Sequence, residues 1–174
     1  MNTRIWQSEE VQDCTENLTL MNAVKCSNLN NLKWLKQVIG DDKFRIEGRE
    51  LIHCMSQAAH QGDLEIIKWL YANGAPLHVL IFRSAARNGK LEVMKWLKEN
   101  QCEWDEEVFR AAAKHGNLEN MKWLKKQQCP WYGNTFSAAA KRGDLETMKW
   151  LRKINAHGMG IPFVLQLSLL VLIT

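Results

Sequence analysis

Apolar and small residues recur at helical spacing in the middle of the chain, and a glycine interrupts them. Phe82, Ala85 and Ala86 stand at positions i, i+3 and i+4, which places them on one face of a helix. The glycine after them, at position 89, can adopt the left-handed conformation that ends a helix. A second apolar stripe follows at intervals of three residues and comprises Leu91, Met94 and Leu97. Trp96 lies on its flank. The pattern predicts two short helices joined by a tight turn.

The same unit is present five times. The tripeptide Lys-Trp-Leu recurs at 33–35, 68–70, 95–97, 122–124 and 149–151, so successive tryptophans lie 35, 27, 27 and 27 residues apart. The first copy is the most divergent and has Ser27 at the glycine position. Because isolated helices shorter than about 12–15 residues are marginal in water, each copy must be stabilised by its neighbours. The sequence therefore predicts an all-α helical solenoid of about five stacked helix-turn-helix repeats.

Polar residues around the turn complete the unit. Asp63, Asn117 and Asp144 follow the glycine and are suited to capping the second helix, whereas Lys90 at the same position is not. In four copies a glutamate stands three residues before the lysine of Lys-Trp-Leu, as in the pair Glu92 and Lys95. These pairs are expected on the exposed side of the second helix.

The motif Ala-Ala-x-x-Gly-x-Leu-Glu-x-x-Lys-x-Leu resembles the centre of the ankyrin repeat, and Asn-Gly-Ala at 73–75 is similar to the loop after that family's second helix. The tryptophan-rich, shortened form is similar to ankyrin-like arrays of large DNA viruses and some protists. The period of 27 residues is shorter than the usual 33 of the family. The missing residues fall between Leu97 and Phe109, and again between Leu124 and Phe136, where the family builds a β-hairpin finger. The resemblance implies a protein-interaction module with clipped fingers and no catalytic activity.

The chain divides into three parts by pattern. Residues 1–17 form an acidic leader that is expected to be disordered, and 18–155 form the array, with units at about 18–53, 54–81, 82–108, 109–135 and 136–155. The long segment 36–53 is expected to hold a turn and loop or one retained finger. The apolar tail 156–174 is a capping helix, an interfacial membrane contact, or a sixth repeat lost to a frameshift.

Charge and cysteine content narrow the class of protein. The leader carries four acidic residues and only Arg4. The rest of the chain therefore has a net charge of +7, and the whole chain has +4. Such an excess permits an acidic partner surface but falls short of a polybasic tract. Five cysteines with no Cys-x-x-Cys pair favour reduced thiols and an intracellular location, in the cytoplasm or nucleus, or in the host cytoplasm for a viral protein. The N-terminus also lacks the apolar core of a secretory signal.

A basic or titratable residue stands two positions before the glycine in every copy, and these residues are Lys25, His60, Arg87, Lys114 and Lys141. In a stack they would form a line of charge along one edge, to which Arg83, Arg110 and Arg142 on the same helices add. One interpretation is a groove for an acidic partner. The alternative is that a helix C-terminus attracts cations, worth about 0.3–1 kcal/mol each.

Aromatic residues in the connecting loops are a second candidate surface. Trp104, Trp131 and Tyr132 would be binding anchors if exposed. The alternative, which the recurrence of the tryptophans favours, is that they cover the seam between adjacent repeats. Cys102 and Cys129 recur in the same way and are expected to be small buried hydrophobes and not metal ligands.

No arrangement of residues predicts chemistry. His53 and His60 share a helix face, but no further ligand completes a metal set. No catalytic residues, cofactor or metal are therefore expected, and the protein is not expected to be an enzyme. Nucleic acid and membranes are disfavoured as partners. The leading function is binding an unidentified protein, and the alternative is a structural or self-associating protein with an apolar tail that contacts a partner or a membrane.

Overall fold

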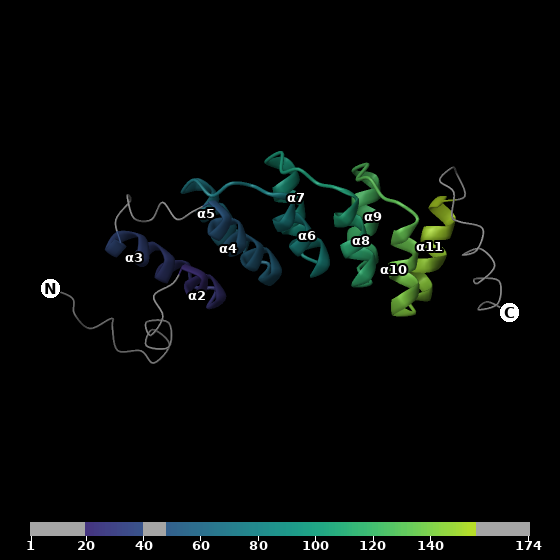
Figure 1. The fold of residues 1–174 in the computed structure, drawn as a ribbon, viewed down its shortest axis with the longest axis horizontal. Coiled ribbons are helices and arrows are strands. Elements are labelled where there is room, and N and C mark those ends of the chain that lie inside the picture. Colours follow the sequence, from purple (N-terminus) through teal and green to yellow (C-terminus); the bar gives the residue numbers. More distant parts are fainter. Residues whose placement is uncertain (1–19, 40–47, 156–174) are drawn as a thin grey trace.

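The computed structural model describes residues 20–39 and 48–155, and every regular element in these ranges is a helix. Within them, ten helices form five consecutive hairpins (Figure 1). The first helices of the hairpins are α2 (Leu20–Lys25), α4 (Gly48–Gln61), α6 (Val79–Arg87), α8 (Glu106–Lys114) and α10 (Asn134–Arg142). The second helices are α3 (Leu29–Ile39), α5 (Leu64–Ala72), α7 (Leu91–Glu99), α9 (Leu118–Lys126) and α11 (Leu145–Asn155). The predicted all-α solenoid is confirmed.

The acidic leader 1–17, the tail 156–174 and residues 40–47 of the long segment 36–53 lie outside the described residues. The described parts of that segment, 36–39 and 48–53, are helical and belong to α3 and α4, so the expected turn and loop is wrong there.

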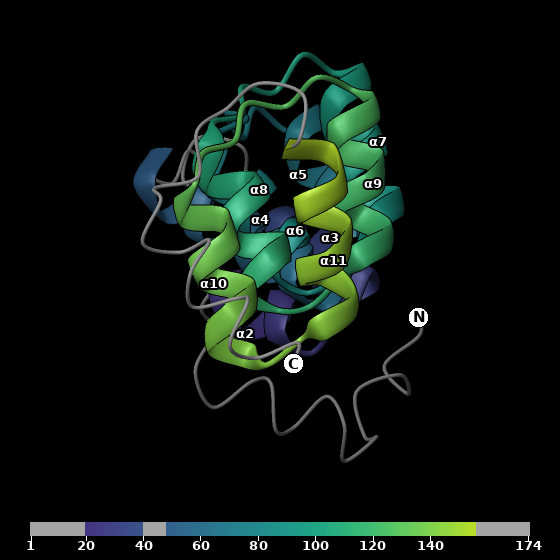
Figure 2. The ribbon, with the colours of Figure 1, turned by 90° about the vertical axis from the view of Figure 1, so that its right-hand side faces the viewer.

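The hairpins stack side by side in a single row. Viewed along the row, the first helices form one layer and the second helices another (Figure 2). Adjacent first helices pack directly, α4 against α6, α6 against α8 and α8 against α10, and each also packs against the second helix of its own hairpin. Neighbouring second helices make fewer contacts with one another. The first helices therefore line the inner side of a curved row.

Each hairpin turns through a residue in the left-handed conformation. Gly62, Gly89, Gly116 and Gly143 have φ between 69° and 93°, and Ser27 takes the same position at φ 51°. The amide that follows the glycine then donates to a carbonyl five residues earlier, as from Lys90 to Ala85 at 3.0 Å. This arrangement satisfies carbonyls that the end of the helix leaves open. The backbone at this turn therefore favours the glycine expected from sequence, although Ser27 also adopts the conformation in the first hairpin.

The predicted caps are confirmed in two of three cases. Asn117 accepts from the amide of Asn120 at 3.1 Å, and Asp144 accepts from the amide of Thr147 at 3.1 Å. For Asp63 the prediction is wrong, because its carboxylate accepts from the hydroxyl of Ser27 in the preceding hairpin at 2.5 Å. The aspartate thus joins two repeats instead of capping its own helix.

The core runs continuously through the stack. Phe82, Ala85 and Ala86 are fully buried at 0% exposure, as expected from the first helix. In the second helix Val93, Met94 and Leu97 are the buried residues, while Leu91 is only half-buried. The predicted stripe is therefore displaced at its first position, because the helix begins at Leu91 and its first residue faces the rim of the stack.

The recurring tryptophans of the second helices are half-buried against this core. Trp123 meets Trp104 of the preceding connector with ring centroids 6.3 Å apart, and Trp104 in turn lies 5.4 Å from Phe82. One repeat further on, Phe109 lies 5.6 Å from Trp131 and 6.4 Å from Trp150. Each aromatic group therefore joins residues from successive hairpins, which is the neighbour dependence that the repeat predicts.

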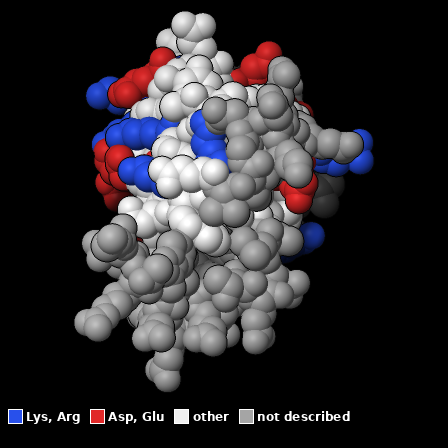
Figure 3. Space-filling view, turned by 90° about the vertical axis from the view of Figure 1, so that its left-hand side faces the viewer, with Lys and Arg blue, Asp and Glu red and all other residues white. Residues whose placement is uncertain are grey.

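Charged side chains lie on the surface of the row. Viewed from the end that carries α2 and α3, Lys, Arg, Asp and Glu lie toward both sides, and Lys or Arg atoms also lie near the middle among uncharged residues (Figure 3). Three of the predicted glutamate–lysine pairs are formed on the second helices, with N to O distances of 2.9, 2.6 and 3.2 Å. None of the described helices has the length and apolar character needed to cross a membrane.

The ends of the second helices provide a test of backbone strain. Gln101 and Gln128 have φ of 60° and 62° after α7 and α9, where Gly74 stands after α5. Replacing Gln128 with glycine should raise the free energy of unfolding by about 0.5–1 kcal/mol, because the left-handed conformation costs a residue with a Cβ. The adjacent Gln127 has φ −84°, so Gln127→Gly should lower stability instead. Urea denaturation of both variants measures the difference, and a shift of the same sign in both would contradict the explanation.

A buried hydroxyl provides a second test of packing. Thr135 in α10 is fully buried and its Oγ1 has no hydrogen-bond partner, whereas Val108 and Ile81 occupy this position one and two repeats earlier. The isosteric change Thr135→Val should raise the free energy of unfolding by about 1 kcal/mol, since it removes an unsatisfied polar group. The reciprocal Val108→Thr should lower stability by about 1–2 kcal/mol. Thermal and urea unfolding check both, and a less stable Thr135→Val protein would show that the hydroxyl has a partner.

Candidate partner-binding site

A line of cations crosses the first helices. Arg87, Lys114 and Lys141 stand in the last turns of α6, α8 and α10, and all three side chains are exposed. We call these three residues the cation row. Because α6, α8 and α10 pack directly against one another, the row runs across the stack at one residue per repeat. Lys25 and His60 hold the same position in α2 and α4.

The arginines one turn earlier are paired. Arg83 donates through Nε to Asp105 at 3.2 Å and forms a second, shorter contact to the same carboxylate. Burial alone would raise the pKa of Asp105, but the hydrogen bond and charge of Arg83 outweigh it and lower that pKa. Arg110 has no such acid, because Tyr132 occupies the position that is equivalent to Asp105 in the following repeat. Arg110 instead donates through Nε to Glu107 on its own helix at 2.8 Å. Of the predicted basic residues, Arg83 is thus largely neutralised by its partner.

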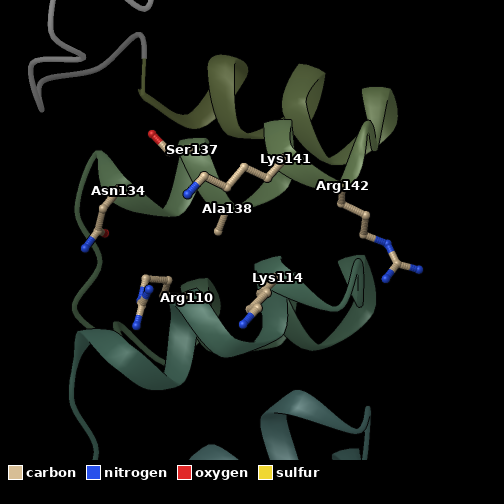
Figure 4. A pocket seen from close by; sticks show the side chains of 7 residues that line it. All are labelled: Arg110, Lys114, Asn134, Ser137, Ala138, Lys141 and Arg142. Atoms are coloured by element: carbon tan, nitrogen blue, oxygen red, sulfur yellow. The ribbon is translucent and has the colours of Figure 1, made fainter.

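A pocket of about 460 Å³ lies between α8 and α10 (Figure 4). Its lining comprises Arg110 and Lys114 from α8 and Asn134, Ser137, Ala138, Lys141 and Arg142 from α10. The ammonium group of Lys141 extends back along α10 toward Asn134, whereas the guanidinium of Arg142 points away from the other labelled side chains. Within the described residues, no carboxylate forms an ion pair with Lys114 or Lys141. The pocket therefore has an excess of positive charge and faces solvent.

The pocket has a local cause in the sequence. Ser137 occupies the repeat position that holds Arg83 in α6 and Arg110 in α8, so a long side chain is replaced by a short one. Sequence reasoning named four of the lining residues but missed Asn134, Ser137 and Ala138. The change from arginine to serine in the repeat alignment is the signal that could have indicated them.

The loop aromatics lie in two different environments. Trp131 is 5% exposed and packs on Phe109, while Trp104 is half-buried between Phe82 and Trp123 with the ammonium of Lys98 3.7 Å from its ring centroid. These contacts support the seam interpretation for both tryptophans. Tyr132 is 56% exposed, so it is the most exposed of the three, and it precedes the pocket-lining Asn134 by two residues.

The described thiols are unsuited to chemistry. Cys102 and Cys129 are buried, with sulfur atoms 3.6 and 3.7 Å from the carbonyl oxygens of His78 and Asp105. Burial, followed by a nearby carboxylate, raises the pKa of Cys102 to about 11 and that of Cys129 to about 12. Both are therefore protonated at neutral pH and are poor nucleophiles and poor metal ligands. Cys54 is also a free thiol, but Cys26 forms a disulfide, so the expectation of reduced thiols is wrong there.

Clusters of metal-ligating side chains are also missing from the part of the chain described. Across 20–39 and 48–155, no group of three or more His, Cys, Asp or Glu side chains could hold a metal ion.

Residues 55–98 match the family model of ankyrin repeats. These residues contain ankyrin repeats. The match extends from α4 to the end of α7, and the two hairpins that follow have the same residue pattern and the same turn geometry. No curated protein is similar enough to the sequence to count as a relative.

The family match indicates the general role of repeats of this kind. Ankyrin repeats are generally protein-interaction modules and are typically not catalytic. The clipped fingers are visible here, because the connectors between Glu99 and Glu106 and between Lys126 and Asn134 contain no strand. The surface made by the first helices carries the cation row and the pocket.

The pKa of His115 depends on the basic residues around it. Partial desolvation of its ring, and then the charges of Arg87, Lys114 and Arg142, lower its pKa. Because the folded state disfavours protonation relative to an unfolded histidine near 6.5, the contribution of His115 to stability is present above about pH 6.5 and is lost as pH falls through the folded pKa.

Removing one of these charges should raise the pKa of His115. We expect Arg142→Gln to move the titration of its ring to higher pH, measured by NMR of labelled histidine. The control Lys68→Gln removes one charge on the distant α5 and should leave that titration unchanged. If both variants shift the titration equally, the net charge of the protein and not the proximity of Arg142 controls the pKa of His115.

Proposed function

We propose that this ankyrin array is a non-catalytic protein-interaction module whose binding surface is the cation row together with the pocket between α8 and α10. The observation that carries the proposal is the pocket itself, in which Lys114 and Lys141 face solvent without an acidic partner among the described residues. Partner proteins with an acidic surface are complementary to it.

The attraction between cations and helix C-termini explains only part of this arrangement. The helix dipole acts within the last turn and favours about one cation per helix. It accounts for Arg87, Lys114 and Lys141 taken singly. It gives no reason for Arg110 to line the same pocket from the middle of α8, or for an arginine to give way to Ser137 where the pocket opens. A binding role accounts for both.

Tyr132 adds a second kind of contact. Its ring is exposed, and tyrosine and arginine are enriched at the energetically dominant positions of protein interfaces. Trp104 and Trp131 support the surface from below, because they hold the connectors against Phe82 and Phe109.

The compartment stays a proposal. The buried free thiols Cys54, Cys102 and Cys129 suit an intracellular location, whereas the disulfide at Cys26 suits an oxidising one.

Affinity capture with matched variants tests the function. We expect the wild-type array to retain at least one protein from its native cells, and the purified partner to bind Lys114→Glu/Lys141→Glu at least about tenfold more weakly, since reversed charges repel an acidic surface. The matched control Lys95→Glu/Lys149→Glu makes the same change on the second helices.

The control should bind as wild type in an affinity titration. Equal retention of the partner by all three proteins would remove the row from the binding surface, and capture of no protein at all would contradict the function.

A further inference from the structure

The last described hairpin leaves open a surface that the inner hairpins bury. Ala86 and Ala113 lie in helices that pack against a following first helix, and both are 0% exposed. Ala140 holds the same position in α10 and is only half-buried. Leu145 at the start of α11 is 45% exposed, whereas its equivalents in the three preceding hairpins are half-buried. The end of the row at α10 and α11 therefore carries an apolar face that the described residues do not cover (Figure 1).

The glycine turns show the same difference between the inner hairpins and the last one. A Cβ at Gly62 would lie 2.9 Å from Cδ of Lys90 in the following hairpin. A Cβ at Gly116 would lie 2.6 Å from Nε of Arg142, which again belongs to the following hairpin. At Gly143 none of the described residues lies within 4 Å of that position. The last hairpin thus has the form of an inner repeat whose neighbour is not among the described residues.

The sequence after α11 keeps the spacing of the repeat at its phenylalanine. Phe163 follows Phe136 by 27 residues, the interval that also separates Phe136 from Phe109 and Phe109 from Phe82. Residues 161–169 are therefore in register with α10, although they lie outside the described residues. They contain no charged side chain, so they resemble in character the apolar face that the last hairpin leaves open.

The repeat register indicates which side of such a segment would meet α10. Two residues after the phenylalanine, Ser84 donates its hydroxyl to the carbonyl of Ser56 in the preceding first helix at 2.7 Å. Ala111 holds the same position in α8 and is 8% exposed. This position therefore faces the preceding repeat. In the segment it is held by Leu165, and Leu169 follows one helical turn later, so the side toward α10 is apolar.

We propose that residues 161–169 pack as a helix along α10 and cover the open face of the last hairpin, at the place of a sixth first helix. A helix of nine residues is too short to be stable alone, so contact with α10 is what orders it. Covering the face also removes apolar surface that would otherwise promote association.

The chain's own segment has an advantage over a second molecule as the occupant of this face. Residues 156–160 link it to α11, which is close in length to the connectors 100–105 before α8 and 127–133 before α10. A short link holds the segment beside the face at an effective concentration on the order of millimolar. A second copy of the protein would have to reach that concentration in solution to compete.

Hydrogen–deuterium exchange of the full-length protein, read by mass spectrometry, tests the contact. We expect the amides of residues 161–169 to exchange at least about tenfold more slowly than in a synthetic peptide of the same sequence, since packing against α10 protects them. Equal rates in the protein and the peptide would overturn the proposal. Protection that disappears when the protein is diluted would assign the face to a second copy and would also overturn it.

Two substitutions in the segment test its orientation. Leu165→Asp places a charge on the side toward α10 and should return the exchange of 161–169 to the rate of the peptide. The matched control Val164→Asp adds the same charge one residue earlier, at the position that the exposed Arg110 holds in α8, and should keep the protection. Circular dichroism verifies that both arrays are folded. Equal effects of the two substitutions contradict the proposed packing.

A substitution on the described face tests the location independently. Leu145→Asp should speed the exchange of 161–169 at least about tenfold, because it places a charge on the face that the segment covers. The matched control Leu80→Asp makes the same change on α6 at a side chain that is 46% exposed, and it should leave the exchange unchanged. Full protection of the segment in Leu145→Asp would show that it lies elsewhere and would reject the proposal.

Discussion

The side-by-side packing of the first helices is the interaction on which the rest of the structure depends. Helices of nine residues such as α6 and α8 are too short to be stable alone. Small residues allow these helices to approach closely, since Ala85, Ala86 and Ala112 are fully buried between neighbours. The phenylalanines and tryptophans then fill the remaining space, and each aromatic group joins successive hairpins. Stability is consequently shared along the row and belongs to no single repeat.

The same packing creates the surface that we propose for binding. A stack with a constant register repeats every position at the distance between helices, so one basic residue per repeat becomes a regular line of charge. Departures from the repeat then make the surface differ from one repeat to the next. Tyr132 in place of Asp105 leaves Arg110 without the acid that Arg83 has, and Ser137 in place of an arginine opens the pocket. The binding surface is thus produced by regular packing together with two local changes.

The residues that we propose for binding are different from those that stabilise the array. The buried thiols and the seam tryptophans lie beneath the connectors, where they support the surface without being exposed. The cations stand in the last helical turns, where the helix dipole favours them even before a partner binds. Such a surface can change its charge pattern from repeat to repeat at little cost in stability, because few of its residues belong to the core.

The sequence by itself determined the all-α class, the hairpin unit and the glycine turns, because the period of apolar residues and the conformational needs of glycine are local properties. It also placed the basic residues on one edge, since equal positions in a repeat must align. Only the tertiary structure decided that Asp63 bonds to Ser27 of the neighbouring hairpin, that Tyr132 is exposed, and that the pocket opens between α8 and α10. These features depend on side chains from different repeats meeting in space. Spacing along the chain states which residues are equivalent but does not state which of them touch.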